Sequence, residues 1–123
     1  MLKPTVLFYD PHGAEWGGKL RQVCAIQGLR LRAVEDGDLG RGVLSLAEGT
    51  PTAEAVQPFP PLPEPMLVLC GLGGAHLDRL LQGLRKAGVP RACLKAVLTG
   101  ENSRWPLHTL YEELVRERDA VGS

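Results

Sequence analysis

The chain has 123 residues, of which 44% are hydrophobic and 23% are charged, which is the composition of a globular protein rather than of a disordered chain. Its 14 basic and 14 acidic side chains give no net charge, which argues against a dedicated nucleic-acid binder and an electrostatic membrane anchor. No apolar run reaches membrane-spanning length and no signal-peptide pattern opens the sequence, so we expect one cytoplasmic domain.

The first unit, residues 1–49, predicts two strands that alternate with two helices. The expected elements are a strand at 5–9, a helix at 14–27, a strand at 29–35 and a short helix at 39–48. Gly28 ends the first helix, because glycine readily adopts the left-handed backbone that closes a helix. Arg30 and Arg32 share one face of the second strand, which is typical of a strand at the edge of a sheet.

The proline-rich segment 50–65 predicts a stiff, extended connector. Its stretch Phe59-Pro60-Pro61-Leu62-Pro63 could also serve as a ligand for a proline-recognition domain. We favour a spacer that crosses the domain surface.

The second unit, residues 66–118, repeats the order of the first. The expected elements are a strand at 66–70, a glycine turn at 71–74, a helix at 75–87, a strand at 92–99 and a last helix from about Pro106. Gly88 stops the helix as Gly28 does in the first unit. Lys95 lies in an otherwise apolar strand, which again indicates a sheet edge. We expect Trp105 to pack the last helix onto the sheet and His108 to be solvated.

A single unit of this kind cannot cover its own sheet, so the two units should share one core. The uncharged strands should be central and the other two should be edges. Right-handed crossovers then favour the order 2-1-3-4 with all strands parallel and the first and third helices on opposite faces. The predicted fold is therefore α/β: a single three-layer domain of two β-α-β-α units around a four-stranded, mainly parallel sheet.

Ligands of open α/β sheets bind where the strand order reverses, beyond the strand ends. Here that position predicts a crevice between the turns at 10–13 and 71–74. The ligand-binding residues expected there are Tyr9, Asp10, His12, Gly13, Cys70, Gly71, Gly73, Gly74 and His76.

No catalytic chemistry is fixed by these residues. The glycines at 71–74 precede a helix and could hold an anion, but both the dinucleotide fingerprint and the Walker pattern are incomplete. A thiol-imidazole pair of Cys70 with His12 or His76 is an alternative, and Asp10 resembles a phospho-acceptor. Metal ligation would need more donors than the set Asp10, His12 and His76 supplies. We predict no catalytic residue, no metal and no cofactor.

The three cysteines, Cys24, Cys70 and Cys93, are isolated and lie in apolar surroundings. An odd number without paired spacing is not a disulfide framework. We expect buried free thiols.

The segment 66–117 resembles the bacterial family known as domain of unknown function 3783. The likeness rests on Pro65-Met66-Leu67-Val68-Leu69-Cys70-Gly71-Leu72, on Leu84-Arg85-Lys86-Ala87-Gly88-Val89-Pro90, and on Leu94-Lys95-Ala96-Val97-Leu98-Thr99. The first half is similar to the amino-terminal part common in such proteins. The resemblance implies no activity and supplies no catalytic residue.

Two functions follow from the sequence. The first is a non-enzymatic α/β module that binds a small ligand or a protein partner, as a monomer or a weak homodimer, without nucleic acid or membrane. The alternative is an enzyme or phosphate-ligand binder that uses the predicted crevice.

Overall fold

The computed structural model describes residues 2–49 and 58–122. Its elements are β1 (Thr5–Tyr9), α1 (Gly17–Ile26), β2 (Arg30–Val34), a 3-10 turn η1 (Asp36–Asp38), α2 (Val43–Glu48), β3 (Met66–Cys70), α3 (Gly74–Lys86), β4 (Leu94–Val97) and α4 (Leu107–Gly122). Each predicted strand and helix is present, with somewhat different bounds. The clearest difference is the region 39–48, where the helix begins only at Val43.

The four strands form one sheet in the predicted order β2-β1-β3-β4. The outer pairs, β1 with β2 and β3 with β4, are parallel as expected. The prediction that all strands are parallel was wrong, because β1 and β3 pair antiparallel, with Thr5 opposite Cys70 and Tyr9 opposite Met66. The reason lies in the connector: the Leu62 amide donates to the Tyr9 hydroxyl, so the chain enters β3 at the end where β1 finishes.

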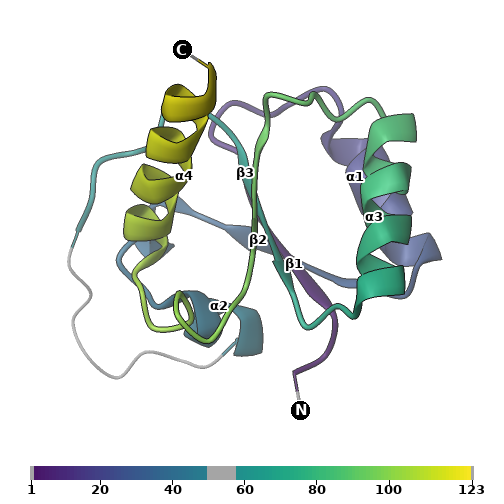
Figure 1. The fold of residues 1–123 in the computed structure, drawn as a ribbon, viewed down its shortest axis with the longest axis horizontal. Helices are drawn as coiled ribbons and strands as arrows, with labels where there is room; N and C mark the ends of the chain where they lie inside the picture. The colour runs from purple at the N-terminus through teal and green to yellow at the C-terminus, as the bar shows by residue number, and fades with distance from the viewer. Residues whose placement is uncertain (1, 50–57, 123) are drawn as a thin grey trace.

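The helices cover both faces of the sheet in pairs (Figure 1). Helices α1 and α3 lie together on one face, and α2 and α4 lie on the other. The prediction that the first and third helices take opposite faces was therefore wrong. With antiparallel central strands, the second unit is turned by 180° relative to the first about an axis perpendicular to the sheet. Such a rotation keeps a helix on the same face, so right-handed crossovers in both units place α1 and α3 side by side.

Each face of the sheet has its own apolar core, because successive side chains of a strand point to opposite sides. In β1, Val6 and Phe8 face α1 and α3, whereas Leu7 and Tyr9 face α2 and α4. Leu20 of α1 and Leu80 of α3 are fully buried in the first core. Burial of one such leucine side chain contributes about 1.5–3 kcal/mol.

The two units are related by an approximate two-fold axis perpendicular to the sheet. The end of α1 and the end of α3 close in the same way: Gly28 and Gly88 have φ of 70° and 85°. The next amides, of Leu29 and Val89, donate to carbonyls five residues earlier at 2.8 and 3.0 Å. Glycine at these two positions is required because side chains disfavour a positive φ.

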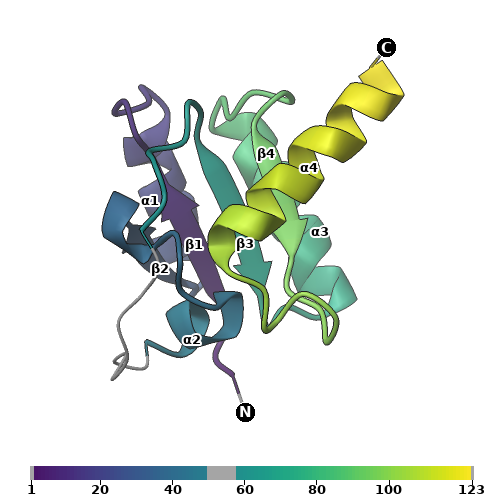
Figure 2. The same ribbon diagram turned by 90° about the vertical axis from the view of Figure 1, so that its left-hand side faces the viewer.

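The same axis relates the entries into α2 and α4, which lie side by side (Figure 2). The Val43 amide donates to the Trp105 carbonyl, and in return the Leu107 amide donates to the Arg41 carbonyl. The first amides of a helix have no partner within it. Each unit therefore supplies a carbonyl acceptor to the first amide of a helix in the other unit. These hydrogen bonds join the two units at a second place besides the β1–β3 pair.

The polar strands β2 and β4 form the edges, as predicted. Lys95 turns its Nζ back to the Cys93 carbonyl at 3.1 Å, and the Asn102 side-chain amide donates to the Val97 carbonyl at 3.1 Å. These side chains occupy carbonyls that an added strand would need, so β4 is protected against edge-to-edge pairing.

The described part of the connector, 58–65, lies on the α4 side of the sheet (Figure 1). Phe59 stacks on His108 with ring centroids 4.2 Å apart, Leu62 is buried, and Arg118 donates two hydrogen bonds to Glu64. These contacts are those of a spacer that crosses the domain surface. They also cover the apolar side chains that a proline-recognition domain would have to bind. His108, expected in solvent, is instead largely covered. The rest of the predicted connector, 50–57, lies outside the described residues.

A cross-link tests the antiparallel pairing directly. In a Thr5→Cys variant, the new thiol lies opposite Cys70 on the same face, at a separation that a disulfide can close with small adjustment. Both positions are buried, so the variant is refolded from denaturant under oxidising conditions, and we expect a bond between residues 5 and 70, detected by peptide mass spectrometry. The control Thr5→Cys/Cys70→Ser should not cross-link within the monomer. Parallel central strands would put residue 5 beside Met66, and a refolded protein without the bond between residues 5 and 70 would contradict the observed register.

Candidate functional site

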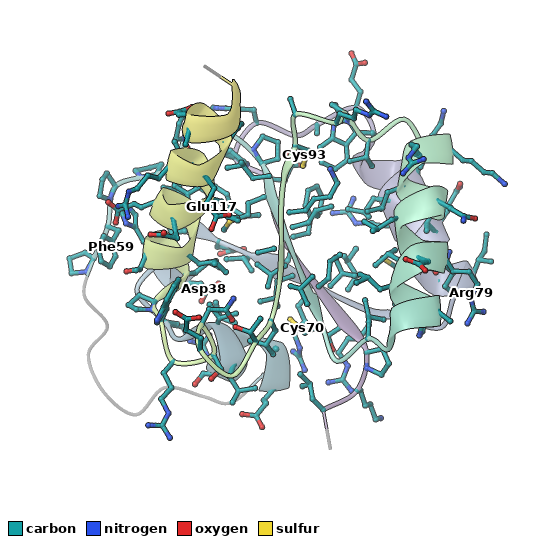
Figure 3. The ribbon with its side chains drawn as sticks, in the orientation of Figure 1. Asp38, Phe59, Cys70, Arg79, Cys93 and Glu117 are labelled. Atoms are coloured by element: carbon teal, nitrogen blue, oxygen red, sulfur yellow. The ribbon has the colours of Figure 1, made fainter. Side chains whose placement is uncertain are left out.

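The predicted crevice is not formed, because antiparallel central strands send the two turns to opposite ends of the sheet. The turn after β1 lies beside the connector, where His12 Nε2 is 3.2 Å from the Pro63 carbonyl. The turn after β3 lies against the start of the chain, since a Cβ on Gly71 would be 3.1 Å from the Leu2 carbonyl oxygen. In Figure 3, Cys70 marks this second end of the sheet and Cys93 the first.

The residues after β1 have structural contacts. Tyr9 donates to the Asp36 carboxylate at 2.6 Å and accepts from the Leu62 amide at 2.9 Å. Burial, with the hydrogen bond to Asp36, raises the pKa of Tyr9 to about 12. The Asp10 carboxylate accepts from the Ala14 amide, as a turn-forming aspartate does. His12 and Gly13 are exposed at this turn.

The residues after β3 do not form a reactive centre. Cys70 is fully buried, and burial raises the pKa of its thiol to about 12. Its thiol lies 3.7 Å from the Val68 carbonyl, and His12 lies at the other end of the sheet. Gly73 precedes α3 and accepts from the Leu77 amide, while Gly74 and His76 form the first turn of α3. Nothing from the turn at 10–13 completes a phosphate site here.

Within the described residues, no group of three or more His, Cys, Asp or Glu side chains is placed to hold a metal ion. Nor does any described helix combine the length and apolarity that crossing a bilayer requires.

A groove of about 520 Å³ lies between α1 and α3. Its lining residues are Lys19, Gln22, Val23, Ile26, Gln27, Arg79, Gln82, Gly83, Lys86 and Ala87. Figure 3 shows Arg79 on the side of α3 that faces away from the sheet. This groove was not predicted from the sequence.

The two walls of the groove are equivalent positions of the two units. Each wall has residues at spacings of three and four along its helix, so they share one face. With Gly28 and Gly88 in register, Lys19 corresponds to Arg79 and Gln22 to Gln82, each pair sixty positions apart. The first pair is two cations and the second is two glutamines. All four side chains are exposed, so core packing does not explain why the residue types match.

The floor of the groove is apolar and closely packed. A Cβ on Gly83 would be 2.8 Å from Val23 Cγ1, so the missing side chain lets the helices approach. Gln27 bridges them by donating to the Arg79 carbonyl at 3.1 Å, and its buried Oε1 has no hydrogen-bond partner among the described residues. Ile26 is 84% exposed and lies beside Val23 in this lining.

The charge of the groove is positive and unbalanced. Its lining includes Lys19, Arg79 and Lys86 and no carboxylate. The ion pairs seen among the described residues all lie on the α2/α4 side and leave these three cations without a partner. An anionic group entering the groove would therefore meet no competing carboxylate.

The buried thiols should be inert in the folded protein. Burial raises the pKa of Cys24 to about 11 and that of Cys70 to about 12, so the reactive thiolate is scarce at pH 8. We expect a disulfide reagent to label only the partly exposed Cys93 quickly and to reach the other two at the unfolding rate. A Cys93→Ser variant should lack the fast phase. Fast labelling of Cys70 would contradict this prediction and would support the alternative of a thiol enzyme.

Removal of the Tyr9 hydroxyl should destabilise the fold. Tyr9→Phe leaves the buried Leu62 amide without its acceptor, which costs about 1–3 kcal/mol in the free energy of unfolding. The folded pKa of about 12 exceeds the ordinary value near 10. The hydroxyl's contribution is therefore complete below about pH 10 and is lost as the pH rises toward 12.

Urea denaturation at several pH values measures this difference between wild type and Tyr9→Phe. Tyr111→Phe is the matched control, because the Tyr111 hydroxyl contacts Glu64 at the longer distance of 3.4 Å, and it should lose less. An equal loss in the two variants, or a difference that does not shrink above pH 10, would contradict the role assigned to Tyr9.

The comparisons with known proteins concern the second unit. No curated protein and no solved structure matches the chain. The sequence model of a family described as a domain of unknown function (DUF3783) matches residues 65–121, which include β3, α3, β4 and nearly all of α4. This match confirms the resemblance seen in the sequence, and the second unit of the chain belongs to the DUF3783 family.

Proposed function

We propose that the chain is a non-enzymatic interaction module that binds a protein partner in the groove between α1 and α3. The observation that carries this proposal is the groove itself: an apolar floor with exposed Ile26, flanked by cations that no described carboxylate neutralises. A concave surface with an apolar floor and a polar rim is typical of protein–protein contact sites.

The dispersal of the chemical groups also favours binding over catalysis. Nucleophile, base and anion-stabilising groups must lie within hydrogen-bond reach of one another to act together. Here the turn at 10–13 and the turn at 71–74 lie at opposite ends of the sheet, and Cys70 is sealed in the core. Nothing observed favours the alternative of an enzyme or phosphate binder at the predicted crevice.

We further propose that the module is monomeric and acts in the cytoplasm. Two copies that met groove to groove would bring Lys19, Arg79 and Lys86 against their own equivalents, and like charges at close range are unfavourable. The three free cysteines suit a reducing compartment.

Site-specific photo-cross-linking in the host cell tests the proposal. A photoreactive phenylalanine derivative at Gln82, in the groove, should yield a discrete adduct with a cellular protein. The same residue at exposed Glu112 of α4 is the matched control and should not. Ile26→Ser should abolish the adduct, because it removes an apolar contact, and it should leave stability unchanged because this side chain is 84% exposed. Absence of an adduct at Gln82, or an equal adduct at Glu112, would refute the proposal.

A further inference from the structure

We infer that the partner presents an acidic amphipathic helix, whose apolar side covers Val23 and Ile26 and whose carboxylates meet two equivalent half-sites in the groove. One half-site is Lys19 with Gln22 on α1, and the other is Arg79 with Gln82 on α3. This inference rests on the function proposed above and adds the chemical class of the partner.

The half-sites suit carboxylates. Residues three apart on a helix are neighbours on one face, so each cation has a glutamine amide beside it. A Lys or Arg supplies charge-assisted hydrogen bonds to a carboxylate, and the amide supplies a further neutral donor. The approximate two-fold axis places the same pair on both walls, so a segment that crosses the groove meets the same chemistry on each side.

The two helical layers of the molecule differ in charge. Helices α1 and α3 carry Lys19, Arg21, Arg79, Arg85 and Lys86 against the single carboxylate of Asp78. Helices α2 and α4 carry Glu48, Glu112, Glu113, Glu117 and Asp119 against Arg116 and Arg118. A chain with no net charge thus presents one basic face, which steers an acidic partner to that face and away from the other.

The shape of the groove favours a helix over an extended strand. Extended peptides add to exposed sheet edges, and here the β4 edge has carbonyls occupied by Lys95 and Asn102. A groove between two packed helices, with a floor flattened at Gly83, is the surface into which the side-chain ridges of a third helix pack. Anchors spaced by three and four residues would reach Val23 and Ile26 in succession.

Other occupants fit less well. A second copy that placed its acidic α4 layer on this groove would make a head-to-tail contact that repeats without closing. Nucleic acid would leave Ile26 facing a phosphate backbone, and the described lining holds no aromatic side chain on which a base could stack. Both are outcomes that the experiment can detect.

The probe is a fluorescent designed helix of about 18 residues, long enough for the five turns that span a helix pair, with leucines on one face and glutamates beside them. One comparison peptide replaces the glutamates with lysines, a second replaces the leucines with serines, and a third probe is a single-stranded RNA. Binding is measured by fluorescence anisotropy at low and high salt, and the contact surface is mapped by amide chemical shifts of the full chain.

The critical variant is Lys19→Glu/Arg79→Glu. Its matched control is Arg21→Glu/Arg85→Glu, which makes the same charge change at exposed positions of the same helices outside the groove. We expect the groove variant to weaken binding of the acidic helix about tenfold or more and the control about twofold or less, because each exposed ion pair contributes modestly. Binding should also weaken with salt, and Gln22→Ala/Gln82→Ala should weaken it less than the charge reversal does.

Equal loss in the two charge-reversal variants would overturn the inference, as would equal binding of the lysine or serine peptide. Tighter binding of the RNA, or amide shifts confined to α4, would do the same. A chain that self-associates in sedimentation experiments, with the association lost in the groove variant, would assign the groove to a second copy. The cross-linking experiment separates the two proposals: a Gln82 adduct on a basic peptide keeps the interaction module and rejects the acidic helix, whereas no adduct rejects the module itself.

Discussion

The antiparallel pairing of β1 with β3 is the constraint on which the rest of the structure depends. It is why both right-handed crossovers place their helices on one face and why the turns after β1 and β3 lie at opposite ends of the sheet. It also brings the entries into α2 and α4 together, where Val43 and Leu107 donate to carbonyls of the opposite unit. The groove between α1 and α3 exists only because these two helices share a face.

Much of the fold could be predicted from the sequence because its determinants are local. The uninterrupted apolar runs of β1 and β3 identified the central strands, and Arg30, Arg32 and Lys95 identified the edges. Gly28 and Gly88 fixed the ends of α1 and α3 because both adopt a positive φ, which glycine reaches without steric cost. Strand direction was not predictable in this way, because a strand that is apolar and buried on both faces has the same hydrophobic pattern whichever way it runs. The direction of β3 depends on contacts of the connector, such as the bond between Leu62 and Tyr9, which join residues far apart in the sequence.

The candidate site was predicted less well, and for a related reason. Tyr9, Asp10 and Cys70 were singled out as chemistry-bearing residues, and each is instead used by the fold: Tyr9 fastens the connector, Asp10 shapes a turn, and Cys70 fills the core. The groove was not predicted because its important side chains are exposed and polar, whereas the apolar periodicity of a helix indicates only its buried face. The correspondence of Lys19 with Arg79 and of Gln22 with Gln82 becomes visible when the two helix-ending glycines are set in register. That these residues face one another requires knowledge of the sheet.

The approximate two-fold axis within the chain has a consequence for how such an architecture can arise. Either unit alone would leave the outer side of its central strand unpaired, together with the first amides of its last helix. A second copy of the same unit, turned by 180°, would satisfy both, which is the isologous arrangement of a homodimer. Duplication and fusion of the gene for such a dimer would give one polypeptide with this layout. Once fused, the halves no longer have to remain identical, so one groove can keep matching cations on its two walls while Ile26 is present on only one of them.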